Sequence, residues 1–223
     1  MNIKLFLETI LKFILGISIM GILLFVPART FDYWNAWLLI SLLSVPMGVI
    51  GIIMMIKSPE LLRKRLDTKE KLKEQKVIVL LSAVMFAAGF VIAGLNHRYC
   101  WTSIPNIVVF IGAAVFILGY ILYAEVLREN QYLSRTIKVQ ENQKVIDKGL
   151  YGIIRHPMYA ASILMFLSTP LILGSIISFA IFLVYPFIIS RRIIAEEKLL
   201  EKELEGYIEY KKKVKYKVIP FVW

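Results

Sequence analysis

Five long runs without a charged side chain or a histidine dominate this sequence of 223 residues. A helix needs about 20 mostly apolar residues to cross roughly 30 Å of hydrocarbon, and the first run reaches that length if Lys12 extends its ammonium group to the interface. Charged residues make up only 19% of the chain, against about 25% in soluble domains. We therefore predict an all-α, polytopic membrane protein with these spans: Phe13–Ala28, Tyr33–Ile56, Val77–Asn96, Tyr99–Ala124 and Pro157–Ser190.

The last run is too long for one ordinary crossing. As a single helix rising about 1.5 Å per residue, Pro157–Ser190 would reach about 51 Å. Its middle contains Thr169-Pro170 and Gly174-Ser175, which favour a break. We interpret the run as a hairpin of two short helices, with one long kinked span as the alternative, so that the chain has five to six transmembrane helices.

Basic residues indicate how the spans are oriented. The segments 57–76, 125–156 and 191–223 hold 23 of the 27 Lys and Arg residues, and all three lie on one side if the spans are as drawn. Basic loops mark the cytoplasmic side, so both termini are expected in the cytoplasm. The net charge of +11 then reflects topology and anionic lipid headgroups, and nucleic-acid binding is not predicted. The single cysteine, Cys100, excludes a disulfide scaffold.

The chain divides into a plain part, 1–124, and a polar C-terminal part, 125–223, in which we look for function. The connector 125–159 is long for a loop, and long loops are commonly functional or disordered. It ends in Arg155-His156-Pro157. Proline is well tolerated in the first turn of a helix, and the free N–H groups there can hold an anion. The alternative is an interface anchor, with Arg155 and Tyr159 at headgroup level.

The tail after the last span carries a second polar pattern. Arg192 and Glu196 are four residues apart and share a helical face. Glu196 could attract a sulfonium or bond a ribose, and Arg192 could clamp a carboxylate or phosphate; an ordinary surface ion pair is the alternative. Residues 196–213 predict an amphipathic helix on the membrane surface, broken or kinked at Gly206, and the apolar end 218–223 is expected to pack back onto the protein or the interface.

Taken together, these segments resemble the isoprenylcysteine carboxyl methyltransferase family and, more loosely, the phospholipid N-methyltransferases. The resemblance covers roughly 125–223 and rests on the order and spacing of five elements: Lys148-Gly149-Leu150-Tyr151, Arg155-His156-Pro157-Met158-Tyr159, Arg192…Glu196-Glu197, Gly206-Tyr207…Tyr210 and Pro220…Trp223. One position departs from the family pattern, which places glycine where this chain has Ala161. The extra methyl group would either tighten helix packing or narrow the pocket.

The resemblance implies a methyltransferase that uses S-adenosylmethionine and releases S-adenosylhomocysteine, with a cytoplasmic cofactor pocket between the connector, the hairpin start and the tail. It implies that Arg192 orients the acceptor. The residues that it implies for the cofactor are Gln140 (on a less secure alignment), Gln143, Lys144, Val145, Ile146, Tyr151, His156, Pro157, Met158, Tyr159 and Glu196.

The expected acceptor is lipophilic, most simply a carboxylate of the isoprenylcysteine type. A carboxylate is already ionised at neutral pH. Its methylation therefore depends on aligning the methyl donor with the acceptor and needs no general base. An amine acceptor must lose a proton, and Glu197 or His156 would then be the base. A phospholipid amine, a fatty acid or a small lipophilic metabolite therefore stays open, as does the oligomeric state.

Two other classes compete with this interpretation. A sterol-reductase-like enzyme would bind NADPH, for which Lys144 and Lys148 could hold the 2′-phosphate. A small transporter or scaffold is disfavoured because the first four spans carry almost no internal charge, whereas transport pathways usually contain ionisable groups. The sequence has no Gly-x-Gly-x-x-Gly motif for a Rossmann-type site and no Cys/His cluster that predicts a metal.

Overall fold

The computed structural model describes residues 3–67, 70 and 73–223, and within them the chain is helical, with no strand. Five stretches are long and apolar enough to cross a membrane, the fifth formed by α7 and α8 together. Their bounds confirm the all-α, multi-pass fold. The helices are α1 (Ile3–Ala28), α2 (Trp34–Lys57), α3 (Pro59–Leu66), α4 (Lys73–Tyr99), α5 (Asn106–Glu129), the 3-10 helix η1 (Gly149–Gly152), α6 (Pro157–Ile172), α7 (Ile176–Phe182), α8 (Tyr185–Glu203) and α9 (Tyr207–Lys213).

The predicted start of the fourth span is wrong. Helix α4 continues to Tyr99, and α5 begins only at Asn106. Cys100 takes a positive φ of 53°, which breaks the helical path, and Pro105 precedes the first turn of α5. Because the residue before a proline avoids the helical region, the chain between these helices forms a short turn.

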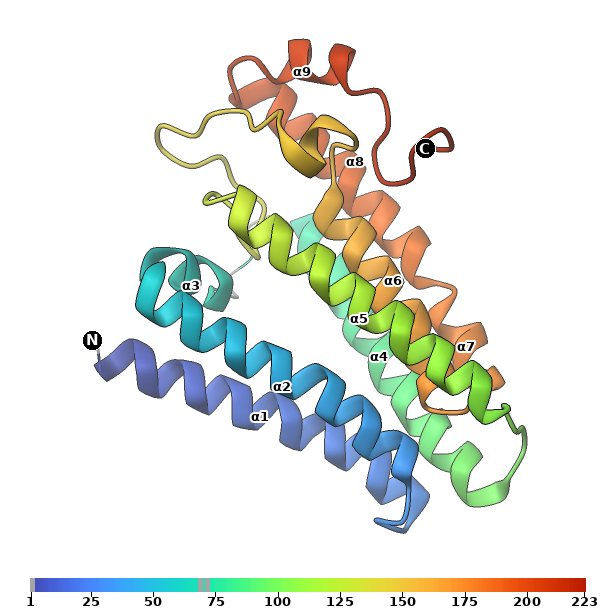
Figure 1. Cartoon of the computed structure of the whole chain (residues 1–223). Helices are drawn as coiled ribbons and strands as arrows, with labels where there is room; N and C mark the ends of the chain where they lie inside the picture. Colours follow the sequence, from blue (N-terminus) through green and yellow to red (C-terminus); the bar gives the residue numbers. More distant parts are fainter. Residues whose placement is uncertain (1–2, 68–69, 71–72) are drawn as a thin grey trace.

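The hairpin prediction is confirmed. Helix α6 ends at Ile172, Gly174 adopts a left-handed φ of 74°, and α7 and α8 return alongside α6 (Figure 1). Ser175 accepts a hydrogen bond from the Ser178 N–H and so caps α7. The second arm is longer than predicted, because α8 runs on to Glu203, beyond the apolar run.

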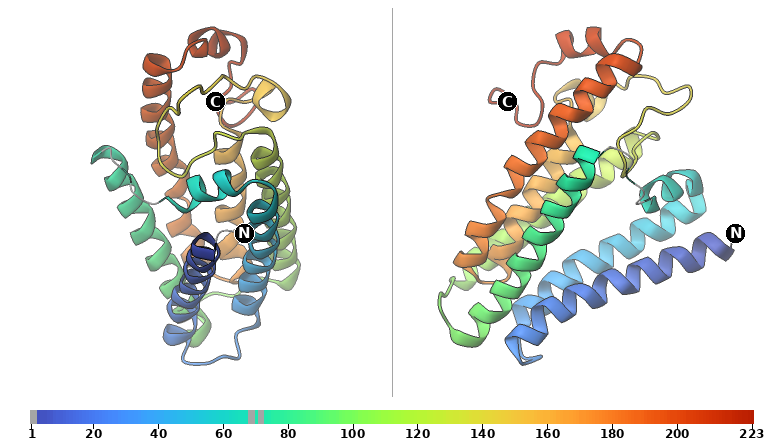
Figure 2. Two further views of the ribbon diagram at one scale, coloured as in Figure 1. Left: turned by 90° about the vertical axis from the view of Figure 1, so that its left-hand side faces the viewer. Right: turned by 180° about the vertical axis from the view of Figure 1, so that it is seen from behind.

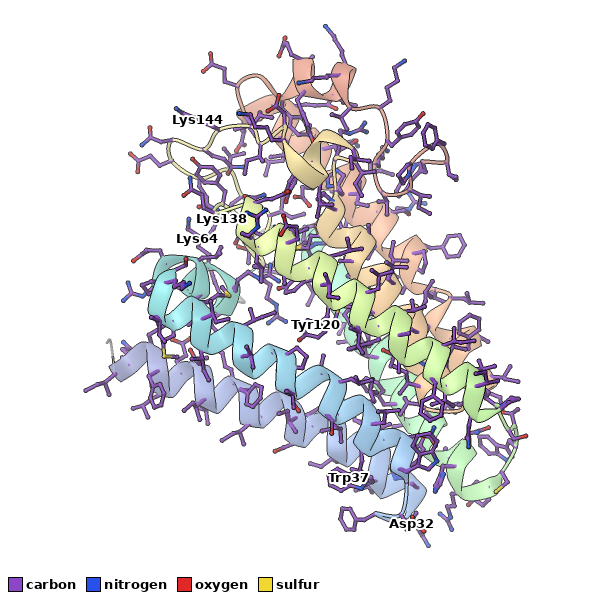
Figure 3. The ribbon with its side chains drawn as sticks, viewed as in Figure 1. Asp32, Trp37, Lys64, Tyr120, Lys138 and Lys144 are labelled. Carbon is purple, nitrogen blue, oxygen red and sulfur yellow. The ribbon has the colours of Figure 1, made fainter. Side chains whose placement is uncertain are left out.

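The three basic segments gather at one end of the molecule. Figures 1 and 2 show α3, the connector and α9 at that end, and the turns α1–α2, α4–α5 and α6–α7 at the other. In Figure 3, Lys64, Lys138 and Lys144 lie at the first end and Asp32 and Trp37 at the opposite end. We call these the basic end and the turn end. Lys69 and Lys71, which the charge prediction also counted, lie outside the described residues.

Neutral hydrogen bonds hold the turn end together. The buried Tyr33 hydroxyl donates to the Leu173 carbonyl at 2.7 Å, and the Asn35 amide donates to the Ile172 carbonyl at 2.7 Å. Asn96 likewise donates to the Thr102 carbonyl. These bonds attach the turn between α6 and α7 to the neighbouring loops. Helix α6 is therefore fixed at the turn end, which helps to position its first residues at the basic end.

Close packing of α5 against α6 completes the frame of the site. A Cβ atom at Gly119 would lie 2.6 Å from Met165 Cγ and 3.0 Å from the Ala161 carbonyl oxygen. Ala161 itself is fully buried. The Ala161 carbonyl therefore lies in the contact between α5 and α6. Helix α5 contains residue 124, the predicted boundary, and packs against α6 of the second part. The division into 1–124 and 125–223 stays a prediction.

The tail differs from the predicted surface helix. Residues 196–203 continue α8, and Gly206, with a φ of 80°, separates it from α9. The apolar side chains of this region pack onto Val139 and Val145 of the connector, because those residues offer the nearest apolar surface at the basic end. Of the last six residues, Val218 packs back onto the protein, whereas Phe221 remains 86% exposed.

Candidate functional site

Arg155 and His156 join the start of α6 to the tail. The Arg155 guanidinium donates to Glu197 Oε1 at 2.7 Å and to the carbonyls of Val214 and Lys215 at 2.8 Å each. His156 Nε2 lies 3.1 Å from the same Glu197 oxygen. Arg155 is only 5% exposed, so the alternative that placed it at headgroup level is wrong. A buried arginine needs such partners, and here they hold residues 214–217 against α6.

A cavity lies beside this junction, between the connector, the start of α6, α8 and α9. It has about 890 Å³ of free space, part of which opens to solvent. Its wall combines aromatic, amide, basic and acidic groups from segments far apart in sequence. The lining residues are Asn130, Tyr132, Leu133, Ser134, Thr136, Ile137, Lys138, Gln143, Lys144, Val145, Ile146, Tyr151, Arg155, His156, Met158, Tyr159, Arg192, Glu196, Leu199, Leu200, Leu204, Tyr207 and Tyr210.

The Tyr159 hydroxyl connects the two charged residues of α8. It donates to Glu196 Oε2 at 2.5 Å and accepts from Arg192 Nε at 3.0 Å. Arg192 and Glu196 therefore do not form a simple surface ion pair; they meet through a buried tyrosine on α6. Tyr159 also lacks the headgroup-level exposure of an interface anchor. The cavity thus offers a carboxylate and a guanidinium side by side, each oriented by the same hydroxyl.

Steric constraints explain why glycine occupies position 149 in the Lys148-Gly149-Leu150-Tyr151 motif. Gly149 has a φ of 59°, and a Cβ atom there would lie 1.7 Å from Glu129 Oε1. The Glu129 carboxylate in turn accepts the Leu150 N–H. This turn delivers Tyr151 to the cavity, where its hydroxyl accepts from the Asn130 amide at 2.8 Å and its carbonyl accepts from the Tyr210 hydroxyl at 2.7 Å.

Tyr207 carries a free hydrogen-bonding group. Its ring is buried in the cavity wall, and its hydroxyl has no partner among the described residues. Burial and the nearby charges of Glu197 and Glu196 raise the pKa of this hydroxyl, which keeps it protonated as a donor. Because buried polar groups are nearly always hydrogen-bonded, this hydroxyl is available to donate to a water molecule or a ligand atom in the cavity.

The structure brings most of the predicted site residues into one wall. Those in the cavity lining are Gln143, Lys144, Val145, Ile146, Tyr151, His156, Met158, Tyr159, Arg192 and Glu196.

Three predicted residues lie outside the lining. Gln140 donates its side-chain amide to the Tyr132 carbonyl and so supports the connector. Pro157 occupies the first turn of α6. Glu197 is buried and bonded to Arg155 and His156, so it reaches the cavity through these two lining residues.

Sequence reasoning missed other members of the wall. It quoted Tyr207 and Tyr210 for the family resemblance without giving them a role, and it did not single out Asn130. No sequence signal identifies an orphaned hydroxyl, because its lack of a partner depends on the tertiary packing of α9. Among the described residues, no group of three or more His, Cys, Asp or Glu side chains could hold a metal ion.

Comparison with known proteins gives a family match over part of the chain. The model of the phospholipid methyltransferase family matches residues 107–205, a range that holds α5, the connector, the hairpin and α8. No curated protein matches the chain. The family match favours a methyltransferase over the reductase and the transporter, and it confirms the resemblance seen in the sequence. Over residues 107–205, this multi-pass chain therefore carries the sequence pattern of the phospholipid methyltransferase family of membrane methyltransferases.

Proposed function

We propose that the protein moves a methyl group from S-adenosylmethionine to an acidic group on a lipophilic acceptor, most simply a carboxylate of the isoprenylcysteine type. The observation that carries the proposal is the cavity wall in which the orphaned Tyr207 hydroxyl, the Glu196 carboxylate and the Arg192 guanidinium occur together. S-adenosylmethionine carries a sulfonium, a ribose and an adenine, which can interact with charged and hydrogen-bonding groups of these kinds.

The fit of the cofactor follows from the donors and acceptors in the wall. Glu196 supplies negative charge for a sulfonium or an acceptor for ribose hydroxyls. Tyr207 supplies a buried donor, and the strip 143–146 supplies amide groups that can recognise an adenine edge. When bound, S-adenosylmethionine would supply an electrophilic methyl group. Tyr159 keeps Glu196 and Arg192 in fixed orientations. These side chains therefore lose little further conformational entropy when the reactants align.

Arg192 is the group that would hold the acceptor. A guanidinium binds a carboxylate with two parallel hydrogen bonds. Its Nε already donates to Tyr159 and its Nη2 to the Arg135 carbonyl at 2.7 Å, so the side chain is preorganised. The acceptor's apolar part would lie in the bilayer, and the cofactor would arrive from water. By the positive-inside rule we place the basic end, and with it the cavity and both termini, in the cytoplasm.

Transfer to a phospholipid amine is the second candidate, favoured by the description of the matching family. An amine must lose a proton before it can attack. His156 lines the cavity and is the nearest base candidate, with Glu197 bonded to its Nε2. Methylation of an amine probe by this protein, with loss of turnover in His156→Ala, would favour this route over the carboxylate.

Calorimetric titration of the purified protein in detergent tests the cofactor assignment. S-adenosylhomocysteine is expected to bind and NADPH, titrated in parallel, is not. Glu196→Ala should weaken S-adenosylhomocysteine binding by about ten-fold or more, and Tyr207→Phe by about three- to ten-fold. Glu203→Gln, at an exposed position near the end of the same helix, is the matched control and should bind normally.

The outcomes separate the alternatives. Binding of NADPH alone would favour a reductase, and binding of neither compound to a folded sample would overturn the cofactor proposal. Arg192→Ala should keep its affinity for S-adenosylhomocysteine and lose methylation of a lipid carboxylate, whereas the neighbouring exposed Arg191→Ala should keep both. Loss of cofactor affinity in Arg192→Ala would contradict the assignment of Arg192 to the acceptor.

A further inference from the structure

Three arginines from different parts of the chain meet next to the cavity. Arg65 comes from α3, Arg135 from the connector and Arg192 from α8. The Arg65 guanidinium donates to the Ser134 carbonyl at 3.3 Å, and Arg192 donates to the carbonyl of the next residue, Arg135, at 2.7 Å. The charges of Arg65 and Arg192 add to desolvation in lowering the pKa of Arg135. We call these three residues the arginine cluster.

The cluster touches the cavity on the side of α6. Arg65 donates to the Tyr123 hydroxyl at 2.5 Å, and its Nη1 lies 3.7 Å from Met158 Sδ. Ser134 and Met158 both line the cavity, as does Arg192. An anion held by the cluster would therefore lie beside the cavity.

Within the part of the chain that the structure describes, two carboxylates face the three guanidinium groups, both at Arg192: Glu196 through a shared tyrosine hydroxyl, and Glu70 directly. The Glu70 carboxylate lies 4.0 Å from Arg192 Nη2. Among the described residues, no carboxylate forms a salt bridge with Arg65 or with Arg135. Guanidinium groups stay charged in proteins, and like charges at short range repel unless an anion separates them.

A buried amide adds an independent observation. Gln75, in the first turns of α4, is 0% exposed, and both its amide atoms lack a hydrogen-bond partner among the described residues. Ile78, one turn further along the same face, packs with Ile189 and Ile193 of α8. Because α4 begins at the basic end (Figure 1), Gln75 lies on the basic-end side of this contact. This amide, unpaired among the described residues, is a further buried polar group of the basic end.

We propose that the arginine cluster is the subsite for the oxyanion of the lipid acceptor, and that Arg65 and Arg135 decide, with Arg192, which acceptors are bound. The inference deepens the proposed function, on which its link to methyl transfer rests. The shared chemistry is a carboxylate or a phosphate on a lipid. Guanidinium groups match the planar geometry of both, and several of them together select charged over neutral acceptors.

Binding of matched lipid pairs by the full-length protein, measured by native mass spectrometry in a neutral detergent, tests this inference. One pair is N-acetyl-S-farnesylcysteine and its methyl ester; the other is dioleoyl phosphatidic acid and dioleoylglycerol. The acidic member of at least one pair is expected to bind about ten-fold more tightly than its neutral partner. The pair that shows the preference identifies the source of the oxyanion.

Variants assign that preference to the cluster. Arg65→Gln should reduce it at least about five-fold while affinity for S-adenosylhomocysteine stays within about two-fold. Arg63→Gln, on the exposed side of the same short helix and paired with Glu60, should leave both unchanged. Arg135→Gln carries the same expectation as Arg65→Gln, and its exposed side chain makes loss of folding less of a concern.

Two outcomes would contradict the role of the arginine cluster. Equal affinity for acidic and neutral lipids in the unmodified protein would overturn the inference, as would an undiminished preference in Arg65→Gln and Arg135→Gln. These lipid measurements need no cofactor. A protein that prefers acidic lipids and fails to bind S-adenosylhomocysteine would therefore overturn the proposed function and leave the oxyanion subsite standing.

Discussion

The two ends of the helix bundle are held together by different chemistry. At the turn end, neutral groups such as Tyr33 and Asn35 bond to backbone carbonyls of the hairpin turn. At the basic end, buried charges such as Arg155 and Glu197 join α6 to α8 and the tail. Among the described residues, the buried side-chain polar atoms without a hydrogen-bond partner belong to Tyr207 and Gln75, both at the basic end. The difference fits the proposal that ligands bind at the basic end, and it predicts that substitutions at the turn end affect stability alone.

The largest expected effect comes from breaking the charged junction. Glu197→Gln removes the negative charge from a pair whose side chains are 3% and 5% exposed, leaving Arg155 buried without a counter-ion. Removing one partner of a buried pair destabilises by about 3–5 kcal/mol. Reversible unfolding in mixed micelles should show this loss, and Glu203→Gln should show none. A change below about 1 kcal/mol would mean that the junction does not hold the basic end together.

Sequence patterns predicted the frame of the molecule because hydropathy and charge are local properties. The apolar runs gave the spans, and Gly174-Ser175 marked the hairpin turn that the structure contains. The same reasoning put the start of the fourth span too early, because an apolar loop before Pro105 looks like part of a helix.

The interactions of the site could not be predicted in the same way. The motif Arg155-His156-Pro157 was visible, but its partner Glu197 lies about 40 residues away, and only folding brings them together. The orphaned Tyr207 hydroxyl and the approach of Arg65 to Met158 depend on how α9 and α3 pack. Sequence therefore indicated which segments to examine, and the structure supplied the contacts.

The next largest effect is expected where α5 meets α6, between the two ends. Gly119→Ala places a methyl group 2.6 Å from Met165 Cγ and 3.0 Å from the Ala161 carbonyl. Overpacking of this kind destabilises by about 1–3 kcal/mol, and any shift of α6 also moves Tyr159. Gly16→Ala is the matched control, since nothing lies within 4 Å of its added Cβ; it should be neutral or slightly stabilising. Equal behaviour of the two variants would contradict the tight contact.

A smaller effect should separate stability from ligand binding at the turn end. Tyr33→Phe removes the hydroxyl that donates to the Leu173 carbonyl at 2.7 Å and should destabilise by about 1 kcal/mol. Affinity for S-adenosylhomocysteine should not change, because the site lies at the opposite end. Tyr99→Phe, at a residue that is 53% exposed, should change neither quantity. Reduced cofactor affinity in Tyr33→Phe would show that the two ends are coupled.

The smallest effect concerns an exposed ion pair between the connector and α9. Lys213 donates to Asp147 Oδ2 at 2.9 Å, and this contact lowers the pKa of Asp147 below its ordinary value of 3.8. A carboxyl group whose pKa is lower in the folded state stabilises fully above its unfolded pKa and loses that contribution as pH falls through the folded value. The melting temperature of Asp147→Asn should therefore lie slightly below that of the unmodified protein at pH 6, begin to approach it below about pH 4, and meet it only below the lowered pKa of the folded state. High salt should remove the difference as well, because exposed pairs are screened. A difference that stays constant from pH 3 to pH 7 would mean that Asp147 acts through the shape of the connector turn and not through its charge.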